Sequence, residues 1–135
     1  MHYQNWALFL VRILLGTTFI LHGSQKVLGL FGGPGLAGFS TFVASLGYPA
    51  WLGYPAAFFE FFGGILLLLG IAPELGALAV IPVMVVAIAS VHGKNGYFGQ
   101  NGGYEYPLNL MILALVVIIG GAGEYALWDF FKSWR

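Results

Sequence analysis

Several side chains with proton-transfer chemistry lie near the ends of apolar segments. His22, Gln25 and Lys26 close the first such segment, and Glu60 lies near the start of the second. Histidine and lysine donate protons or hydrogen bonds, and a carboxylate accepts protons, so this set suits proton transfer to a bound ligand. We therefore take Glu60, His22 and Lys26 as the candidate catalytic residues.

A glycine-rich stretch from His92 to Glu105 holds a second group of polar and aromatic side chains. Its five glycines allow positive φ repeatedly, so its backbone amides can hold an anion or a carbonyl oxygen. It carries no phosphate-loop or dinucleotide fingerprint. A tight turn whose aromatic side chains anchor it at a membrane surface accounts for the same residues equally well. The candidate ligand-binding residues are Arg12, Gln25, His92, Asn95, Phe98, Asn101, Tyr104 and Glu105.

Four of these residues are of metal-ligating types, namely His22, Glu60, His92 and Glu105. No two of them have the close spacing that marks a metal-binding motif. We expect no metal site.

The composition favours a protein that lies in lipid. Hydrophobic residues make up 59% of the 135 residues and charged residues 7%, whereas a soluble domain has about 25% charged residues. The formal net charge is zero and there is no basic run, so we expect no nucleic-acid binding. There is no cysteine, so a redox role would need a bound cofactor or a partner protein.

The elements that must position these side chains are four apolar segments, at about residues 6–28, 54–71, 75–91 and 107–121. Each approaches the ~20 residues that cross a bilayer. Pro55 begins the second, and Gly70 followed by Pro73 ends it. The sequence predicts an all-α, integral membrane four-helix bundle that forms one domain over residues 1–135. Between the first two helices, residues 35–47 have helical apolar spacing and predict a short interfacial or re-entrant helix, with an ordered loop as the alternative.

Alternating crossings bring the candidate residues to one membrane face. His22 and Lys26 lie in the last turns of the first helix, at the depth of Glu60 in the second. Arg12 shares a helical stripe with Lys26, so we expect Glu60 to pair with Arg12 or with Lys26. Gly16 and Gly23 lie on that stripe, and Gly63-Gly64 follow Glu60, which predicts close helix contacts. A buried ion pair that only fixes helix packing remains an equal alternative to a chemical site.

An even number of crossings places both chain ends on one side of the membrane. Two basic residues, Lys132 and Arg135, lie near the C-terminal end, and two others, Lys26 and Lys94, lie on the opposite face. The positive-inside rule then favours cytoplasmic termini by a narrow margin. No basic residue precedes the first apolar segment, so we expect this segment to remain as a helix instead of being removed as a signal peptide.

Motifs over nearly the whole chain resemble the DoxX family of small bacterial and archaeal membrane proteins. They are Arg12-Ile-Leu-Leu-Gly16, His22-Gly23, Gln25-Lys26, Glu60 with Gly63-Gly64 and Leu69-Gly70, Asn95-Gly96-Tyr97-Phe98, Asn101 to Tyr106, and Gly121 to Leu127. Family members often end in Ser-Leu-Asp, whereas this chain has Ala126-Leu127-Trp128-Asp129, one residue longer. The resemblance implies a four-helix fold in the bacterial or archaeal cytoplasmic membrane. It also implies an association with redox proteins, because some relatives are described as subunits of thiosulfate:quinone oxidoreductase and others as partners in thiol, oxidative-stress or quinone-resistance systems.

Three functions remain open from the sequence. The first is an oxidoreductase, or a subunit of one, in which Lys26 or His22 polarises a quinone carbonyl and Glu60 relays protons. The second is a non-catalytic scaffold for a soluble or membrane redox partner. The third is a small-solute transporter, against which the absence of a visible inverted repeat argues. The expected surroundings are the lipid bilayer, and self-association into a homo-oligomer stays open.

Overall fold

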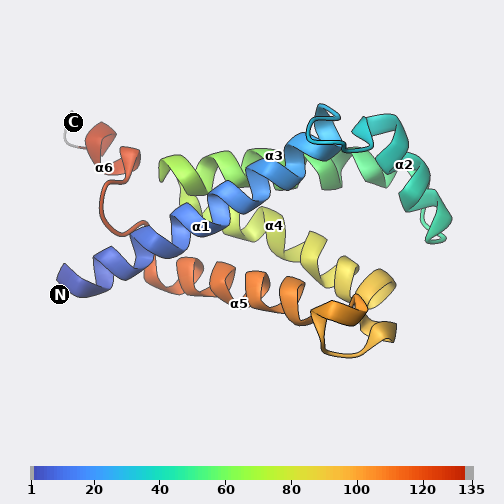
Figure 1. Ribbon diagram of the computed structural model, residues 1–135. Helices are drawn as coiled ribbons and strands as arrows, with labels where there is room; N and C mark the ends of the chain where they lie inside the picture. Colours follow the sequence, from blue (N-terminus) through green and yellow to red (C-terminus); the bar gives the residue numbers. More distant parts are fainter. Residues whose placement is uncertain (1, 133–135) are drawn as a thin grey trace.

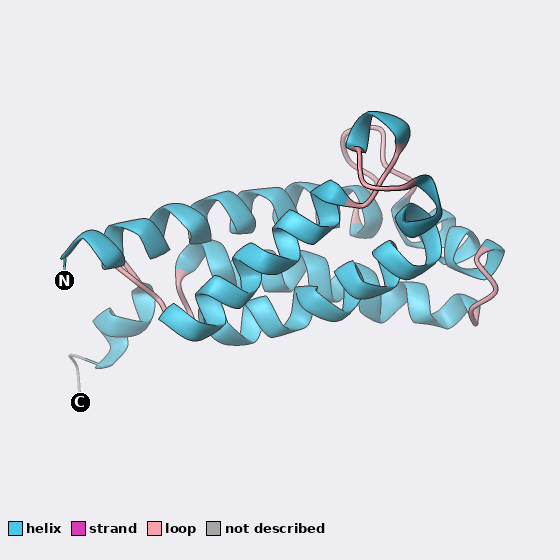
Figure 2. Ribbon diagram, turned by 90° about the horizontal axis from the view of Figure 1, so that it is seen from below, coloured by secondary structure: helices cyan, strands magenta, loops and turns pink. Residues whose placement is uncertain are grey.

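The computed structural model describes residues 2–132, and within this range every regular element is a helix (Figure 2). The four long helices are α1 (His2–Val27), α3 (Gly53–Leu69), α4 (Pro73–Ala87) and α5 (Glu105–Gly120). The shorter α-helices are α2 (Gly35–Ser45) and α6 (Leu127–Lys132). A π-helix, η2 (Ile88–His92), continues α4, and three 3-10 turns are η1 (Ala50–Leu52), η3 (Gly93–Asn95) and η4 (Gly99–Asn101).

The long helices pack side by side around a common apolar core (Figure 1). α3 packs along α1 and α4, and α5 packs along α4 and also touches α1. The start of α1 and α6 lie at one end of the molecule, and α2 and the α4–α5 loop lie at the other (Figure 1). Leu15, Phe19, Leu67, Val80 and Val117 belong to this core and are almost completely buried.

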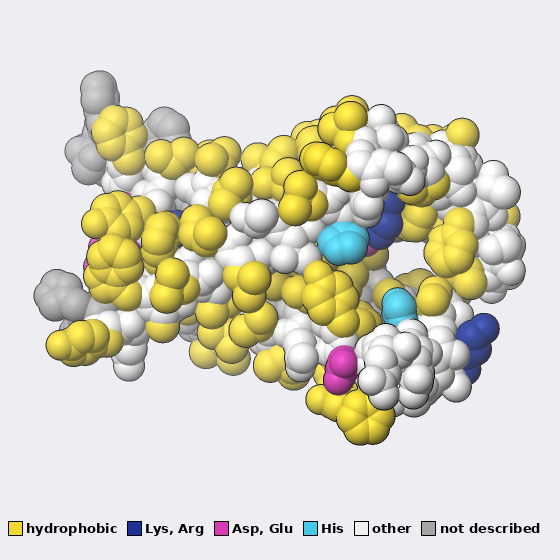
Figure 3. Space-filling model, viewed as in Figure 1, with side chains coloured by type: hydrophobic (Ala, Val, Ile, Leu, Met, Phe, Trp, Pro, Cys, Tyr) yellow, Lys and Arg dark blue, Asp and Glu magenta, His cyan; other side chains and the backbone are white. Residues whose placement is uncertain are grey.

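The outer surface identifies a membrane protein. Within the described residues, three helical stretches are long and apolar enough to cross a bilayer, Tyr3–Val27, Ala50–Leu69 and Pro73–Asn95. Large apolar side chains remain exposed on these helices, for example Leu10, Phe62 and Leu78. Figure 3 shows hydrophobic side chains over most of the visible face. An apolar exterior on helices of this length is typical of a surface that faces lipid.

Helix ends agree with the proline and glycine signals. Gly70 caps α3 with a left-handed φ of +67°, and Pro73 occupies the first turn of α4. The amide of Gly70 donates to the carbonyl of Leu67, and that of Ile71 to the carbonyl of Leu66, which satisfies the end of α3. α1 begins earlier than expected, at His2, and α5 is 16 residues long, or about 24 Å.

Glycines allow α1 and α3 to approach closely, as predicted. A Cβ on Gly16 would lie 2.6 Å from the amide nitrogen of Leu68, and one on Gly23 would lie 2.5 Å from Cα of Phe61. From the other side, a Cβ on Gly64 would lie 2.7 Å from the amide nitrogen of Ile20. No larger side chain fits at these positions without moving backbone.

Candidate functional site

A cavity of about 750 Å³ opens where α1, α2, α3, the end of α4 and the start of α5 meet. We call it the main pocket, and Figure 3 shows a hollow with histidine side chains beside it at the end away from the termini. Its polar or ionisable wall residues are His22, Lys26, Tyr48, Glu60, His92 and Tyr106. The rest of the wall is apolar and includes Phe39, Phe42, Val43 and Leu46 from α2. Pockets for small organic ligands have this size and this mixture.

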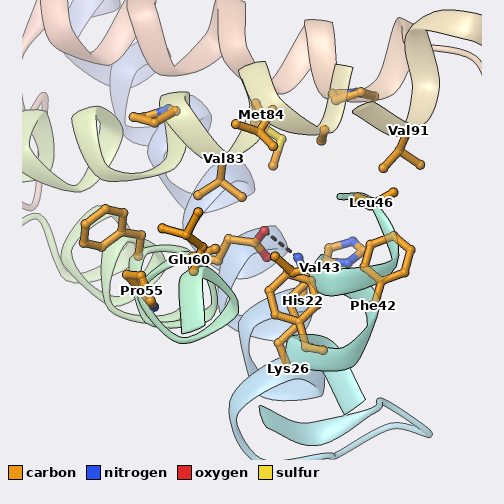
Figure 4. Close-up of a pocket in the computed structure, with 18 of the residues that line it drawn as sticks. His22, Lys26, Phe42, Val43, Leu46, Pro55, Glu60, Val83, Met84 and Val91 are labelled. Carbon is orange, nitrogen blue, oxygen red and sulfur yellow. Dashed lines mark hydrogen bonds and ion pairs between the residues drawn. The ribbon is translucent and has the colours of Figure 1, made fainter. Parts of the chain in front are cut away.

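Lys26 of α1 and Glu60 of α3 meet inside the main pocket (Figure 4). Lys26 Nζ donates to Glu60 Oε1 over 2.5 Å, and the exposed fractions of the two side chains are 22% and 1%. Nζ also lies 4.7 Å from the centre of the Phe39 ring. An ammonium group has three N–H donors, so donors beyond the one given to Glu60 remain for a ligand. The structure therefore selects Lys26 from the two expected partners of Glu60.

His22 lines the same pocket one turn before Lys26. Its ring centre lies 6.3 Å from that of Tyr106 at the start of α5. Its side chain is exposed and makes no hydrogen bond to any of the described residues. The imidazole is thus available to a molecule in the cavity.

His92 reaches the pocket from the π-helix at the end of α4. Its Nδ1 lies 2.8 Å from the carbonyl oxygen of Gly102. π-helical turns are rare in proteins, and those that occur often lie at functional sites. His92 is the member of the candidate ligand-binding set that lines the main pocket.

Arg12 lies at the opposite end of the protein. Its guanidinium donates to the carbonyl oxygens of Ala122 at 2.6 Å, Glu124 at 3.1 Å and Tyr125 at 3.2 Å. The expected alternative of an Arg12–Glu60 pair is wrong, because Arg12 precedes Lys26 by 14 residues, or about 21 Å of helix. Arg12 is 1% exposed and holds the chain between α5 and α6.

The other expected ligand-binding residues lie outside the pocket wall. Gln25 Nε2 donates to the carbonyl of Phe31 in the α1–α2 turn. In the α4–α5 loop, Asn95 donates to the carbonyl of Gly102, and Glu105 accepts from the amide of Gly99. The remaining residues of the set are Phe98, Asn101 and Tyr104, none of which lines the pocket. Of these residues, Asn95 shares the Gly102 carbonyl oxygen with the pocket residue His92.

Tyr48 and Tyr106 are pocket residues that sequence reasoning did not assign to the site. The Tyr48 hydroxyl lies 2.7 Å from the hydroxyl of Ser90, which joins the α2–α3 connection to the π-helix. Tyr48 stands in a turn before Pro49, where no helical spacing indicates its direction. Tyr106 directly follows the glycine-rich stretch, and an aromatic side chain there is explained equally well as an anchor at the membrane surface.

An apolar helical exterior around a cavity with a few ionisable groups defines a membrane protein whose cavity has the size and lining of a small-ligand pocket. The chain belongs to the DoxX family, whose family model matches residues 7–93. It is 29% identical over 108 residues to a Bacillus subtilis (strain 168) protein named "Putative oxidoreductase CatD", covering 80% of this chain and 75% of that one. It is 32% identical over 139 residues to an uncharacterized Haemophilus influenzae protein, covering 97% and 96% of the two chains. No solved structure matches.

Proposed function

We propose that this membrane protein takes part in redox chemistry by binding a quinone-like ligand in the main pocket, as an oxidoreductase or as a subunit of one. The observation that carries the proposal is the Lys26–Glu60 ion pair in the wall of an otherwise apolar cavity of about 750 Å³. Family membership and the name of the Bacillus subtilis relative support a redox association.

The chemistry of a quinone suits this wall. A quinone is a flat apolar ring with two carbonyl oxygens, and its reduction takes two electrons and two protons to give a hydroquinone. A free N–H of Lys26, or the His22 imidazole, donates a hydrogen bond to one carbonyl and favours the negative charge that develops there. Glu60 relays the two protons, which are taken from water, to the two ring oxygens one after the other. The two electrons come from outside the chain, from a bound cofactor or a partner redox protein, since the chain has no cysteine of its own.

The test uses calorimetry to measure the binding of decylubiquinone to the purified protein in nanodiscs. We expect saturable binding at one site per chain. Glu60→Gln keeps the size of the side chain but removes the charge that holds Lys26, so it should weaken binding about tenfold or more. The matched control is Glu74→Gln, because Glu74 is half-buried and lines a separate cavity with Asp129 at the other end. Absence of saturable binding by the unaltered protein would overturn the proposal.

We also propose that α5 is a fourth crossing, with α2 lying at the membrane surface. α5 is apolar, packs along α4 and touches α1, and α6 returns to the end at which α1 starts. Of the charges that favoured cytoplasmic termini, Arg135 and the side chain of Lys132 lie outside the described part of the chain.

Because the chain has no cysteine, single introduced cysteines report its topology directly. With an impermeant maleimide on intact cells, we expect Gln100→Cys to react from outside. Gln4→Cys and Leu127→Cys should react only after the cells are opened. Reaction of Leu127→Cys and Gln100→Cys from the same side would mean that α5 does not cross.

A non-catalytic scaffold is the second candidate function, and the exposed α4–α5 loop favours it. Every residue from Gly93 to Gly102 is exposed, so a partner can contact the loop. A scaffold would keep its cellular function in the Lys26→Met/Glu60→Leu double variant, which replaces the buried ion pair by apolar side chains, and in His22→Ala. It would lose that function when Lys94 and Gln100 are both changed to glutamate. The quinone-binding function predicts the reverse pattern in cells challenged with menadione.

A further inference from the structure

The α4–α5 loop fixes one ring nitrogen of His92. A carbonyl oxygen carries no hydrogen, so the 2.8 Å contact between His92 Nδ1 and the Gly102 oxygen requires the hydrogen to be on Nδ1. In a neutral imidazole with this tautomer, Nε2 has a lone pair and is an acceptor. His92 therefore offers a hydrogen-bond acceptor, whereas the Lys26 ammonium in the same pocket offers donors.

The Gly102 carbonyl is itself held in place by the loop. Gly102 has a left-handed φ of +72°, and its amide donates to the carbonyl of Gly99. Asn95 Nδ2 donates to the same Gly102 oxygen at 3.1 Å. The Gly99 amide in turn donates to Glu105 Oε1 at 2.8 Å. These bonds connect the loop to the first turn of α5 and leave the carbonyl little freedom to rotate.

Close packing inside the loop adds to this rigidity. Gly103 is buried, and a Cβ there would lie 2.4 Å from the carbonyl oxygen of Gly96. The amide of Tyr104 donates to that same oxygen at 3.0 Å. The glycines of the loop thus allow two stretches of its backbone to lie close together.

The two polar regions of the pocket make different demands on a ligand. The Lys26 ammonium donates to an oxygen atom whether that oxygen is a carbonyl or a hydroxyl. An acceptor nitrogen is satisfied only by a ligand that has a hydrogen to donate, and a carbonyl facing it would leave two lone pairs in contact. A hydroquinone supplies O–H groups, whereas a quinone supplies none.

We infer that His92, held by Gly102 and Asn95, makes the main pocket selective for the reduced, hydroxyl-bearing form of its ligand. This inference rests on the proposed quinone-binding function. His92 Nε2 accepts a hydrogen bond from a ring hydroxyl, and Lys26 donates to the other ring oxygen. Asn95, Gly102 and Glu105 are positioning residues that act through His92 and do not line the pocket themselves.

The test compares durohydroquinone with duroquinone by anaerobic equilibrium dialysis against the purified protein. The measured quantity is the ratio of the two dissociation constants. We expect the unaltered protein to bind the hydroquinone about tenfold more tightly, which is the effect of one hydrogen bond. The control is Gln100→Ala, since Gln100 is exposed in the same loop and should leave the ratio unchanged.

Two substitutions separate recognition from a structural role of His92. Asparagine places an N–H near the position of Nδ1, so His92→Asn keeps a donor for the Gly102 carbonyl and has nothing in place of Nε2. It should fold normally and lose the tenfold preference. Glutamine places an amide near the position of Nε2, so His92→Gln should recover part of the preference through its amide oxygen.

Gly102→Ala tests the positioning residues, because alanine is strained at the positive φ of Gly102. It should reduce the preference while the affinity for duroquinone stays within about twofold. If the unaltered protein binds both forms with equal affinity, or if His92→Asn keeps the preference, the inference is wrong and the proposed function stands. If neither form binds, both fail.

Discussion

Lys26 and Glu60 are 34 residues apart in the chain and form an ion pair in which the carboxylate is almost completely buried. The pair fastens the end of α1 to α3 and places charge in an apolar cavity. Its two partners differ in burial, because Lys26 keeps 22% of its side chain exposed and Glu60 only 1%. Because only Lys26 keeps an exposed part, replacing Lys26 and replacing Glu60 should have different effects on stability and on ligand binding.

Removing one partner of the pair should cost more than removing both. Lys26→Met leaves a buried carboxylate without its partner and should lower the free energy of unfolding by about 3–5 kcal/mol. Glu60→Leu leaves an ammonium that reaches water and should cost less. The double variant Lys26→Met/Glu60→Leu should approach the unaltered stability, because apolar pairs replace buried ion pairs well, and it should no longer bind quinone.

Chemical denaturation in detergent measures these three stabilities. A double variant as unstable as Lys26→Met would contradict the pairing argument. A double variant that is stable and still binds decylubiquinone would reduce the pair to helix packing alone.

Gly23 should tolerate no side chain. Alanine at this position places a methyl group against the backbone of α3, which must move away from α1. We expect a loss of about 1–3 kcal/mol from overpacking, together with weaker quinone binding, because the same movement separates Lys26 from Glu60. The control is Thr17→Ala, since Thr17 is exposed on α1 and gains no contact. Equal stability of the two variants would show that α1 and α3 have room to adjust.

The Tyr48–Ser90 hydrogen bond should slow ligand exit. It joins the α2–α3 connection to the π-helix beside the main pocket. Tyr48→Phe removes only the hydroxyl and should raise the dissociation rate of a bound quinone about fivefold, which corresponds to one hydrogen bond of about 1 kcal/mol. Stopped-flow displacement measures this rate.

Ser90→Ala removes the other partner of that bond and should have the same effect on the dissociation rate as Tyr48→Phe. The double variant should be no faster than either single variant if the bond itself is responsible. Additive effects would mean that the two hydroxyls act separately.

Arg12 should support the fold without affecting the ligand. Arg12→Lys keeps the charge, but one ammonium cannot reach the three carbonyl groups that the guanidinium holds, so we expect a loss of about 3 kcal/mol. Affinity for decylubiquinone should stay within about twofold, because Arg12 lies at the far end of α1 from the main pocket. Lys94→Gln, at an exposed basic residue, is the control. A variant with normal stability and poor ligand binding would place Arg12 in the ligand path.

Much of the architecture follows from local chemistry and was predicted. Proline and glycine signals locate the boundary between α3 and α4. Glycine spacing predicts close helix contacts, and the structure shows them between α1 and α3. A similar depth for Lys26 and Glu60 also follows, because a helix advances by a fixed rise per residue. A shared helical stripe also allows Arg12 as a partner of Glu60, because the stripe fixes direction around the helix axis and not position along it.

The loop residues show where such reasoning stops. Asn95 and Glu105 are polar residues near a predicted site, and each instead bonds to backbone within the loop. Gln25 is adjacent to Lys26 but points about 100° away from it around the helix, toward the α1–α2 turn. Loop conformation depends on hydrogen bonds between residues that no fixed period relates.

Residue types and short-range spacing are enough to assign this chain to lipid, to delimit its helices and to put His22, Lys26 and Glu60 at one depth. These features depend on residues that are close in the sequence, and the helical period relates the positions of such residues. The choice of Lys26 over Arg12, the entry of Tyr48 and Tyr106 into the pocket and the hold of Gly102 on His92 depend on contacts between distant segments. Such contacts arise only when the helices pack, because packing fixes which side chains share a cavity and which face backbone.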